Sequence, residues 1–163
     1  SRFVKLFSNY CSTEQTLKRI YLDVCALCRP YDDQSYTRIH LETTAVQLIL
    51  RAIERGDYEL FYSPVHEKEI SVILNYQERV DLLYLLKEIG RKIFPSGKNG
   101  RRRAEYLVDS GLGVADAAHI AYAEHAGAVF ISCDDKLIKK CNRLDITIWT
   151  TNPVMFCDKE GIQ

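Results

Sequence analysis

The sequence predicts one α/β domain in which helices cover both faces of a central parallel sheet of about four strands. Two observations support this fold class. Short apolar runs alternate along the chain with longer segments whose apolar residues recur every three or four positions. The length of 163 residues suits a single domain, and a hydrophobic fraction of 47% is enough to supply a core. Strands that alternate with helices in this way usually pair in parallel and are buried on both faces.

The first half of the chain contains two expected strands and the segments that connect them. Residues 18–22 form an apolar run that is typical of a buried strand. Residues 28–35 contain Pro, Asp and Ser and are expected to form a loop. Residues 36–55 place apolar side chains at helical spacing, and a Gly-Asp pair ends that helix. Residues 58–62 are expected to form the second strand.

The second half continues the alternation. Pro64 is well placed at the first turn of a helix. Residues 79–94 repeat apolar side chains at steps of three and four, which indicates another helix. The remaining expected elements are a loop at 95–100, helices at 101–109 and 116–126, a strand at 128–131, a helix at 134–141, a strand at 146–149 and a short helix after 152–153.

The ends of the chain differ from this pattern. Residues 1–18 are polar and have no clear period, so we expect an N-terminal arm there. The domain itself is expected to span residues 19–157, followed by a C-terminal tail of residues 158–163.

The composition excludes several classes of protein. Lysine plus arginine and aspartate plus glutamate number 22 each, so any contact with nucleic acid must come from a local patch. No segment approaches the ~20 apolar residues of a membrane span, and the first residues are too charged for a secretory signal. Apart from Cys25-x-x-Cys28, the six cysteines show no paired spacing, which favours reduced thiols in a cytoplasmic protein over a zinc or redox site.

Four acidic residues, Asp23, Glu69, Asp116 and Asp134, are far apart in the sequence but are expected at one edge of the sheet. Two follow strands and two lie in early turns of helices, and right-handed crossovers bring all these positions to the same edge. Clustered carboxylates repel one another and are costly to bury. A fold that gathers them normally holds a hard cation such as Mg²⁺ or Mn²⁺. The sequence therefore predicts a metal-dependent phosphoryl-transfer enzyme.

Each acid also has a simpler interpretation. Asp116 precedes an Ala-rich helix, where an Asp is often an N-cap. Glu67 competes with Glu69 for the same role, and Asp135 competes with Asp134. The spacing alone does not choose between the members of these pairs.

Five motifs occur in a fixed order between residues 19 and 156. They are YLDVCAL at 21–27, SPVHEKEI at 63–70, VADAAHIAYA at 114–123, FISCDDKL at 130–137 and NPVMF at 152–156. Any one of these motifs is loose, but the ordered set resembles a PIN domain of the kind seen in VapC-type toxins. The resemblance does not cover residues 1–18.

The resemblance implies a PIN-like three-layer fold and a Mg²⁺- or Mn²⁺-dependent endoribonuclease. By the same resemblance, Asp23, Glu69, Asp116 and Asp134 are the catalytic acids. The metal would be held by Asp23, Asp116 and Asp134, and Glu69 would complete the site directly or through water. A metal-activated water would then attack the scissile phosphate in line.

Hydroxyl and basic residues give the expected substrate contacts. Ser132 matches the family's hydroxyl residue near the last acid, whereas Val24 replaces a residue that is often Thr or Ser. The densest basic cluster is either a solvated helix start or a phosphate-binding loop. The basic residues concerned are Lys98, Arg101, Arg102 and Arg103, with Lys136, Lys139, Lys140 and Arg143 as a second stripe on the helix after Asp134.

Two further residues keep alternative roles. Glu42 resembles a recurrent acid in a bacterial subgroup of the family, and it is expected either to pair with Arg38 across one helical turn or to approach the site. His119 lies one helical turn after Asp116, where it either faces the site or packs within the helix layer.

The resemblance also suggests partners and leaves rivals. We expect RNA as substrate, a protein antitoxin, and a homodimer to which the Tyr-rich helix at 76–84 contributes an apolar surface. The first alternative is a PIN-fold module that binds RNA or protein without cutting. A phosphoaspartyl enzyme with Asp23 as nucleophile is less consistent, because the haloacid-dehalogenase type normally has a second Asp where this chain has Cys25.

Overall fold

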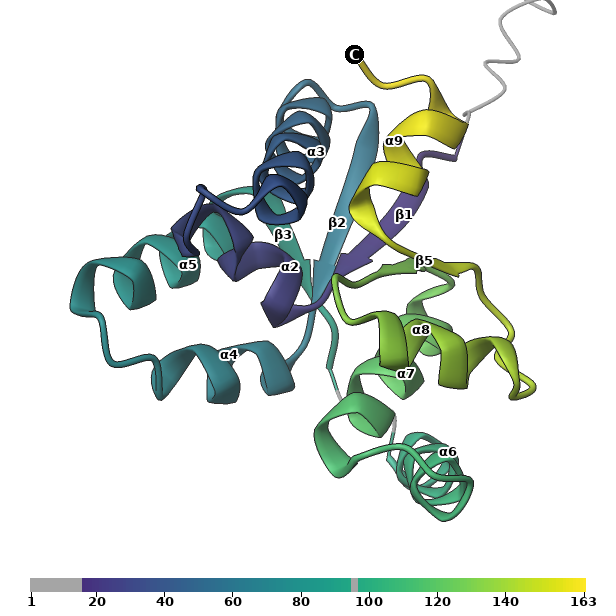
Figure 1. The fold of residues 1–163 in the computed structure, drawn as a ribbon. Helices are drawn as coiled ribbons and strands as arrows, with labels where there is room; N and C mark the ends of the chain where they lie inside the picture. Colours follow the sequence, from purple (N-terminus) through teal and green to yellow (C-terminus); the bar gives the residue numbers. More distant parts are fainter. Residues whose placement is uncertain (1–15, 95–96) are drawn as a thin grey trace, which may run out of the picture.

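The computed structural model describes residues 16–94 and 97–163 and has a parallel sheet at its centre (Figure 1). Within these residues the sheet has five strands, in the order β3-β2-β1-β4-β5, and every neighbouring pair is parallel. The strands are β1 (Lys18–Leu22), β2 (Tyr58–Tyr62), β3 (Gly90–Lys92), β4 (Val129–Ile131) and β5 (Thr150–Thr151). The predicted α/β class is confirmed, with one strand more than expected. Most of the expected N-terminal arm, residues 1–15, lies outside the described residues.

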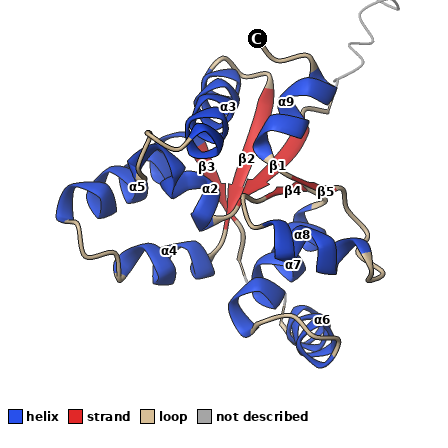
Figure 2. Ribbon diagram, in the orientation of Figure 1, coloured by secondary structure: helices blue, strands red, loops and turns tan. Residues whose placement is uncertain are grey.

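Helices form the other two layers (Figure 2). None of those within residues 16–94 and 97–163 is long and apolar enough to cross a bilayer. Their bounds are α2 (Val24–Cys28), the 3-10 helix η1 (Arg29–Tyr31), α3 (Thr37–Glu54), α4 (Pro64–Ser71), α5 (Tyr76–Ile89), α6 (Lys98–Asp109), α7 (Val114–Ala126), α8 (Asp135–Asn142) and α9 (Pro153–Glu160).

The alternation of side chains along β1 divides the core into two parts. Ile20 and Leu22 face one side of the sheet and pack with buried residues of α3, α5 and α9. Tyr21 faces the opposite side and packs with buried residues of α6, α7 and α8. The sheet is therefore covered on both faces, as a parallel sheet requires.

Two element boundaries were predicted wrongly. The expected helix over 79–94 ends at Ile89, because Gly90 takes an extended conformation and starts β3 beside Tyr62 of β2. The last strand lies at Thr150–Thr151 instead of 146–149. The apolar residues Ile146 and Ile148 that suggested a strand are partly buried against the second core while outside any regular element.

Three helix ends also differ from expectation. Helix α6 begins at Lys98, three residues before the expected start. Helix α7 begins at Val114, so that Asp116 lies inside its first turn. Helix α9 continues to Glu160, past the expected domain boundary at residue 157.

Gly90 is expected to be intolerant of a side chain. A Cβ at this position would lie 2.5 Å from the carbonyl oxygen of Leu86 and 2.8 Å from Cδ1 of Tyr62. Gly90→Ala should therefore lower the free energy of unfolding by about 1–3 kcal/mol, the usual cost of overpacking. Urea unfolding followed by circular dichroism would measure this. Arg91→Ala, which trims an exposed neighbour, is the control and should cost less than ~1 kcal/mol; equal midpoints for the two variants would contradict the close approach at Gly90.

Candidate functional site

Asp23 lies where the carboxyl ends of β1 and β4 meet. Its backbone N–H donates to the carbonyl of Ile131, the last residue of β4, at 3.0 Å. Its side chain is the N-cap of α2, and Oδ1 accepts from the backbone N–H of Ala26 at 3.0 Å and from Sγ of Cys25 at 2.9 Å. The topology therefore fixes Asp23 at the edge of the sheet, as predicted.

The Asp23 carboxyl group is almost fully buried, with 6% of the residue exposed. Burial raises its pKa well above the ordinary value, and Cys25 raises it further. Hydrogen bonds from Ser132 and Ala26 act in the opposite direction but do not cancel the shift. Ionising Asp23 is therefore costly in this environment, and the ionised group needs a positive partner.

Ser132 connects two of the acids and does not face solvent. It is completely buried, and its Oγ accepts from the backbone N–H of Asp134 at 3.0 Å. Its hydroxyl group also hydrogen-bonds to the Asp23 carboxyl and lowers the pKa of that group. The expectation of a direct contact between Ser132 and substrate is therefore corrected, because a buried hydroxyl between Asp23 and Asp134 organises the site from behind.

Asp134 is exposed at the start of α8. Its Oδ1 accepts from the backbone N–H groups of Lys136 at 3.0 Å and Leu137 at 3.1 Å, so it is the N-cap of this helix. The neighbouring Asp135 is engaged elsewhere, because its Oδ2 lies 2.6 Å from Nη1 of Arg38 on α3. Of this competing pair, Asp134 is the residue at the carboxyl edge of the sheet.

Asp116 is half-buried in the first turn of α7. The N-cap of this helix is Gly113, so the N-cap interpretation of Asp116 is wrong. Its pKa is raised, first by burial and then by the charges of Asp134 and Glu69. His119 and Lys140 lower the pKa but do not offset the other causes. Acids from three separate elements therefore share one electrostatic neighbourhood.

Glu69 on α4 reaches this neighbourhood through a histidine. Its Oε1 is hydrogen-bonded to Nε2 of His119 on α7. Glu67 is held away from the group, because its Oε1 lies 2.5 Å from Nζ of Lys92 on β3. His119 is the residue whose role the sequence left open, and the structure places it in contact with a predicted site acid.

Glu42 has a structural role. It is buried on α3 and accepts from Nε of Arg38 at 3.0 Å and from Nη2 of Arg29 at 3.3 Å. Arg38 in turn pairs with Asp135. These ion pairs join η1, α3 and α8.

The donor chemistry of the four acids fits a hard divalent cation, because all the donors are carboxylate oxygens. Asp23 and Asp134 each use Oδ1 to cap a helix. Their present directions do not form a closed ligand set: among residues 16–94 and 97–163, no group of three or more His, Cys, Asp or Glu side chains is arranged to hold a metal ion. The acids would therefore need to reorient for a cation to be held by three of them.

The basic cluster at the start of α6 divides into two kinds of residue. Nε and Nη2 of Arg103 donate to the two carboxylate oxygens of Glu124 at 2.8 and 3.0 Å, so Arg103 is a structural residue and its expected phosphate contact is corrected. Arg101 pairs with Glu105 on the exposed surface. Lys98 and Arg102 are exposed and make no ion pair within the part of the chain that the structure describes.

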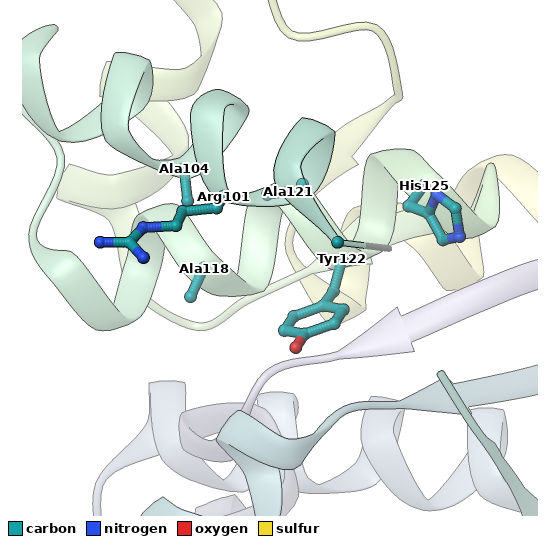
Figure 3. Close-up of a pocket in the computed structure, with 8 residues that line it drawn as sticks. Arg101, Ala104, Ala118, Ala121, Tyr122 and His125 are labelled. Atoms are coloured by element: carbon teal, nitrogen blue, oxygen red, sulfur yellow. The ribbon is translucent and has the colours of Figure 1, made fainter. Parts of the chain in front are cut away.

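A hollow of about 190 Å³ lies beside this cluster, between α6 and α7 (Figure 3). Small alanine side chains form its floor, and Arg101, Tyr122 and His125 surround them. None of the four site acids lines it. The hollow is thus separate from the acidic edge, although Tyr122 and His119 belong to the same helix.

The Arg103–Glu124 pair is expected to stabilise the fold. Burial would raise the pKa of Glu124, but hydrogen bonds from Arg103 and Thr147 outweigh this and hold the pKa below its ordinary value. A depressed pKa means that the stabilisation is present at neutral pH and is lost as the pH falls through the folded-state value. Arg103→Ala should therefore lower the free energy of unfolding by about 1–3 kcal/mol at pH 7, and by less at pH 3. Thermal unfolding at the two pH values would measure this.

Arg102→Ala is the matched control, because Arg102 is exposed. It should leave stability within about 0.5 kcal/mol. An equal loss of stability in Arg102→Ala and Arg103→Ala would contradict the structural role of Arg103.

The fold and its acidic edge define a three-layer α/β domain with carboxylates at the carboxyl ends of a parallel sheet. The chain belongs to the PIN domain family, whose sequence profile matches residues 20–143. The family expected from the five motifs is therefore confirmed.

Two solved structures share this fold. FitAcB from Neisseria gonorrhoeae has a TM-score of 0.53 and 14% sequence identity, over 82% of this chain and 97% of that one. FitAB bound to an IR36 DNA fragment has a TM-score of 0.53 and 17% identity, over 83% of this chain and 95% of that one. No curated protein sequence matches the chain. At these identities the likeness establishes the fold.

Proposed function

We propose that this chain is an endoribonuclease that depends on Mg²⁺ or Mn²⁺. The observation that carries the proposal is the placement of the acids: Asp23 and Asp134 cap the helices that follow the paired strands β1 and β4, and Glu69 is hydrogen-bonded to His119, one turn after Asp116. The raised pKa of Asp116, caused by burial and by the charges of Asp134 and Glu69, agrees with this placement. Gathering like charges costs free energy, and a bound divalent cation would offset that cost. Membership of the PIN domain family, whose members are generally nucleases, supports the same class of reaction.

Asp23, Asp116 and Asp134 would hold the ion, and Glu69 would complete the site. A bound ion would polarise a phosphoryl oxygen and lower the pKa of a bound water. The chain itself orients the acids: the N-terminus of α2 fixes Asp23 and the N-terminus of α8 fixes Asp134. Ser132 joins these two groups from the buried side. This arrangement supports an anionic edge at which the acids lie near one another, although they must still reorient to hold one ion together.

The RNA backbone would lie along exposed basic residues around this edge. Lys140 lowers the pKa of Asp116 by its charge, so it lies close enough to interact with a substrate at the site. Lys136 is exposed on the first turn of the same helix, α8. We include Lys98, Arg101 and Arg102 as further phosphate contacts, since each is exposed on α6.

We further propose that the chain acts as the toxin of a toxin–antitoxin pair and forms a homodimer. A free ribonuclease would need restraint, which supports a protein antitoxin. FitAB, which shares the fold, has been solved with a DNA fragment, and this supports a nucleic-acid context. Tyr76, Val80 and Tyr84 are exposed at four-residue spacing on α5 and are our candidate for the dimer surface.

The experiment that tests the activity is cleavage of a pool of single-stranded and structured RNAs by the purified chain. New RNA ends should appear with Mn²⁺ or Mg²⁺ and disappear when EDTA is added. Sequencing of the ends would locate the cuts. Absence of ion-dependent ends in every RNA, from protein that is folded by circular dichroism, would overturn the proposal.

The second candidate is a PIN-fold module that binds RNA or protein without cutting. Two observations favour it. Within residues 16–94 and 97–163, no group of three His, Cys, Asp or Glu side chains is arranged to hold a metal ion. Burial also raises the pKa of Asp23, which favours the neutral form of its carboxyl group. Such a module would bind RNA equally well with Mn²⁺ and with EDTA and would leave the RNA intact. A gel-shift assay run beside the cleavage assay separates the two candidates.

A further inference from the structure

A chain of buried polar groups leads from the centre of the sheet to Glu69. The hydroxyl of Tyr21 on β1 lies 2.8 Å from Oγ of Ser63 and 2.5 Å from Nδ1 of His119. The other ring nitrogen of His119, Nε2, is hydrogen-bonded to Oε1 of Glu69. Tyr21 and Ser63 are completely buried and His119 is 3% exposed, so water cannot substitute for the hydrogen bonds that join these three residues.

A carboxylate oxygen of Glu69 can only accept a hydrogen bond, so Nε2 of His119 is the donor to Glu69. Nδ1 of His119 hydrogen-bonds to the Tyr21 hydroxyl, as an acceptor in a neutral imidazole and as a donor in an imidazolium. Burial raises the pKa of Tyr21 well above its ordinary value, so this hydroxyl keeps its proton. The Tyr21 hydroxyl also hydrogen-bonds to Oγ of Ser63.

A second histidine keeps the surroundings of the chain uncharged. His66 packs edge-on against His119 with ring centroids 4.9 Å apart. Its Nδ1 accepts from the backbone N–H of Ser63 at 3.1 Å, and its Nε2 donates to the carbonyl of Leu22 at 2.6 Å. Burial, with a smaller effect of His119, lowers the pKa of His66 to about 3. His66 is therefore a neutral ring against which His119 packs.

We propose that His119 and Tyr21 are positioning residues that fix the direction of the Glu69 carboxylate at the acidic edge. Glu69 has a long side chain, 38% exposed, whose rotational freedom opposes a single orientation. His119 lies one turn after Asp116 on α7, so the same helix carries one acid and orients another. The part of the proposal that concerns catalysis rests on the proposed ribonuclease activity. The part that concerns the hydrogen-bond chain does not.

The hydrogen-bond chain is tested by long-range ¹H–¹⁵N NMR of the histidine side chains in the metal-free protein. We expect a proton on Nε2 of His119, protected from exchange with water. Glu69→Ala should remove the acceptor and speed the exchange. A ring that carries its proton on Nδ1 alone, or an Nε2 proton that exchanges at the same rate in wild type and Glu69→Ala, would overturn the proposal whatever the activity of the protein.

The catalytic part is tested by a pair of substitutions at one position. In His119→Gln the side-chain amide nitrogen stands in for Nε2 and still reaches Glu69, whereas His119→Asn is too short. Loss of position at a reacting centre costs up to about 100-fold. We therefore expect His119→Asn to lower kcat for RNA cleavage by about 10- to 100-fold with KM changed less than about threefold. His119→Gln should recover about tenfold of that loss.

Tyr21→Phe and His40→Asn complete the design. Tyr21→Phe removes one hydroxyl and keeps the packing, so it carries the test if His119→Asn fails to fold, and its kcat should fall by about three- to tenfold. His40 is exposed on α3, and His40→Asn should match wild type. Wild-type kcat in Tyr21→Phe together with equal kcat for the two His119 variants would overturn the positioning role. An inactive wild type would count against the ribonuclease proposal alone, and the NMR result would then decide the hydrogen-bond chain.

Discussion

Asp116→Asn is expected to lower the rate of RNA cleavage by about 100- to 1,000-fold and to leave the fold intact. Asp116 is the acid on which the charges of neighbouring acids act most directly, because Asp134 and Glu69 both raise its pKa. Asparagine keeps the shape of the side chain but removes the charge that would bind the cation. Single-turnover cleavage with Mn²⁺ in excess would measure the loss.

The same substitution should also change stability in a known direction. A carboxyl group whose pKa is raised by folding gives most stability below its unfolded-state pKa and loses it as the pH rises through the folded-state value. Wild type should therefore lose stability relative to Asp116→Asn between pH 4 and pH 7.5. Asp158→Asn, on the exposed face of α9, is the control and should affect neither cleavage nor stability. Unchanged cleavage by Asp116→Asn would remove this residue from the site.

Phe156→Ala is expected to have the largest effect on stability, about 3–5 kcal/mol of the free energy of unfolding. Phe156 on α9 is completely buried against the first core. Its ring packs against those of Tyr58 and Trp149, with centroids 5.6 and 5.7 Å away. Because whole domains are stable by only about 5–15 kcal/mol, this loss would bring the protein close to unfolding at 37 °C.

Met155 gives the control for this prediction. It is the preceding residue on α9, with 44% of its surface exposed, so Met155→Ala should cost less than about 0.5 kcal/mol. Urea denaturation of both variants would compare the two. A cost for Phe156→Ala as small as that for Met155→Ala would mean that α9 is not part of the domain, and the proposed domain boundary near residue 157 would have to move toward the N-terminus.

The place of the acids was predictable because it depends on topology. A parallel sheet with right-handed crossovers brings the residues after β1 and β4 to one edge, whatever the details of packing. That is why Asp23 and the pair Asp134–Asp135 could be placed from apolar runs. The choice of one acid in each competing pair needed the family resemblance. In the structure, Glu67 and Glu69 of α4 differ in their partners, which are Lys92 on β3 and His119 on α7.

The errors have a common physical cause. Arg103 was assigned from the local density of basic residues, Ser132 from the family resemblance and residues 90–92 from helical periodicity. The roles of all three depend on residues distant in the sequence. Arg103 is paired with Glu124 on the adjacent helix. Ser132 is enclosed by the meeting of β1 and β4. Residues 90–92 follow a helical pattern and become β3 only because β2 offers an edge with free backbone groups.

His119 illustrates a signal that the sequence contained without specifying its meaning. The spacing of three residues from Asp116 placed it on the same side of α7. Its contact with Tyr21 and Glu69 depends on the positions of β1 and α4 relative to that helix. Nothing in the local pattern separates such a histidine from one that only packs.

The measurement that tests the central claim most directly is anomalous X-ray diffraction from crystals soaked in Mn²⁺. The proposal of a divalent-metal ribonuclease predicts an anomalous peak at the carboxyl edge of the sheet, with oxygens of Asp23, Asp116 and Asp134 about 2 Å from the ion. The same crystals of Asp116→Asn should lack the peak. The claim would be contradicted if no peak appeared at this edge after full Mn²⁺ soaking and the three carboxylates kept the positions they have without metal.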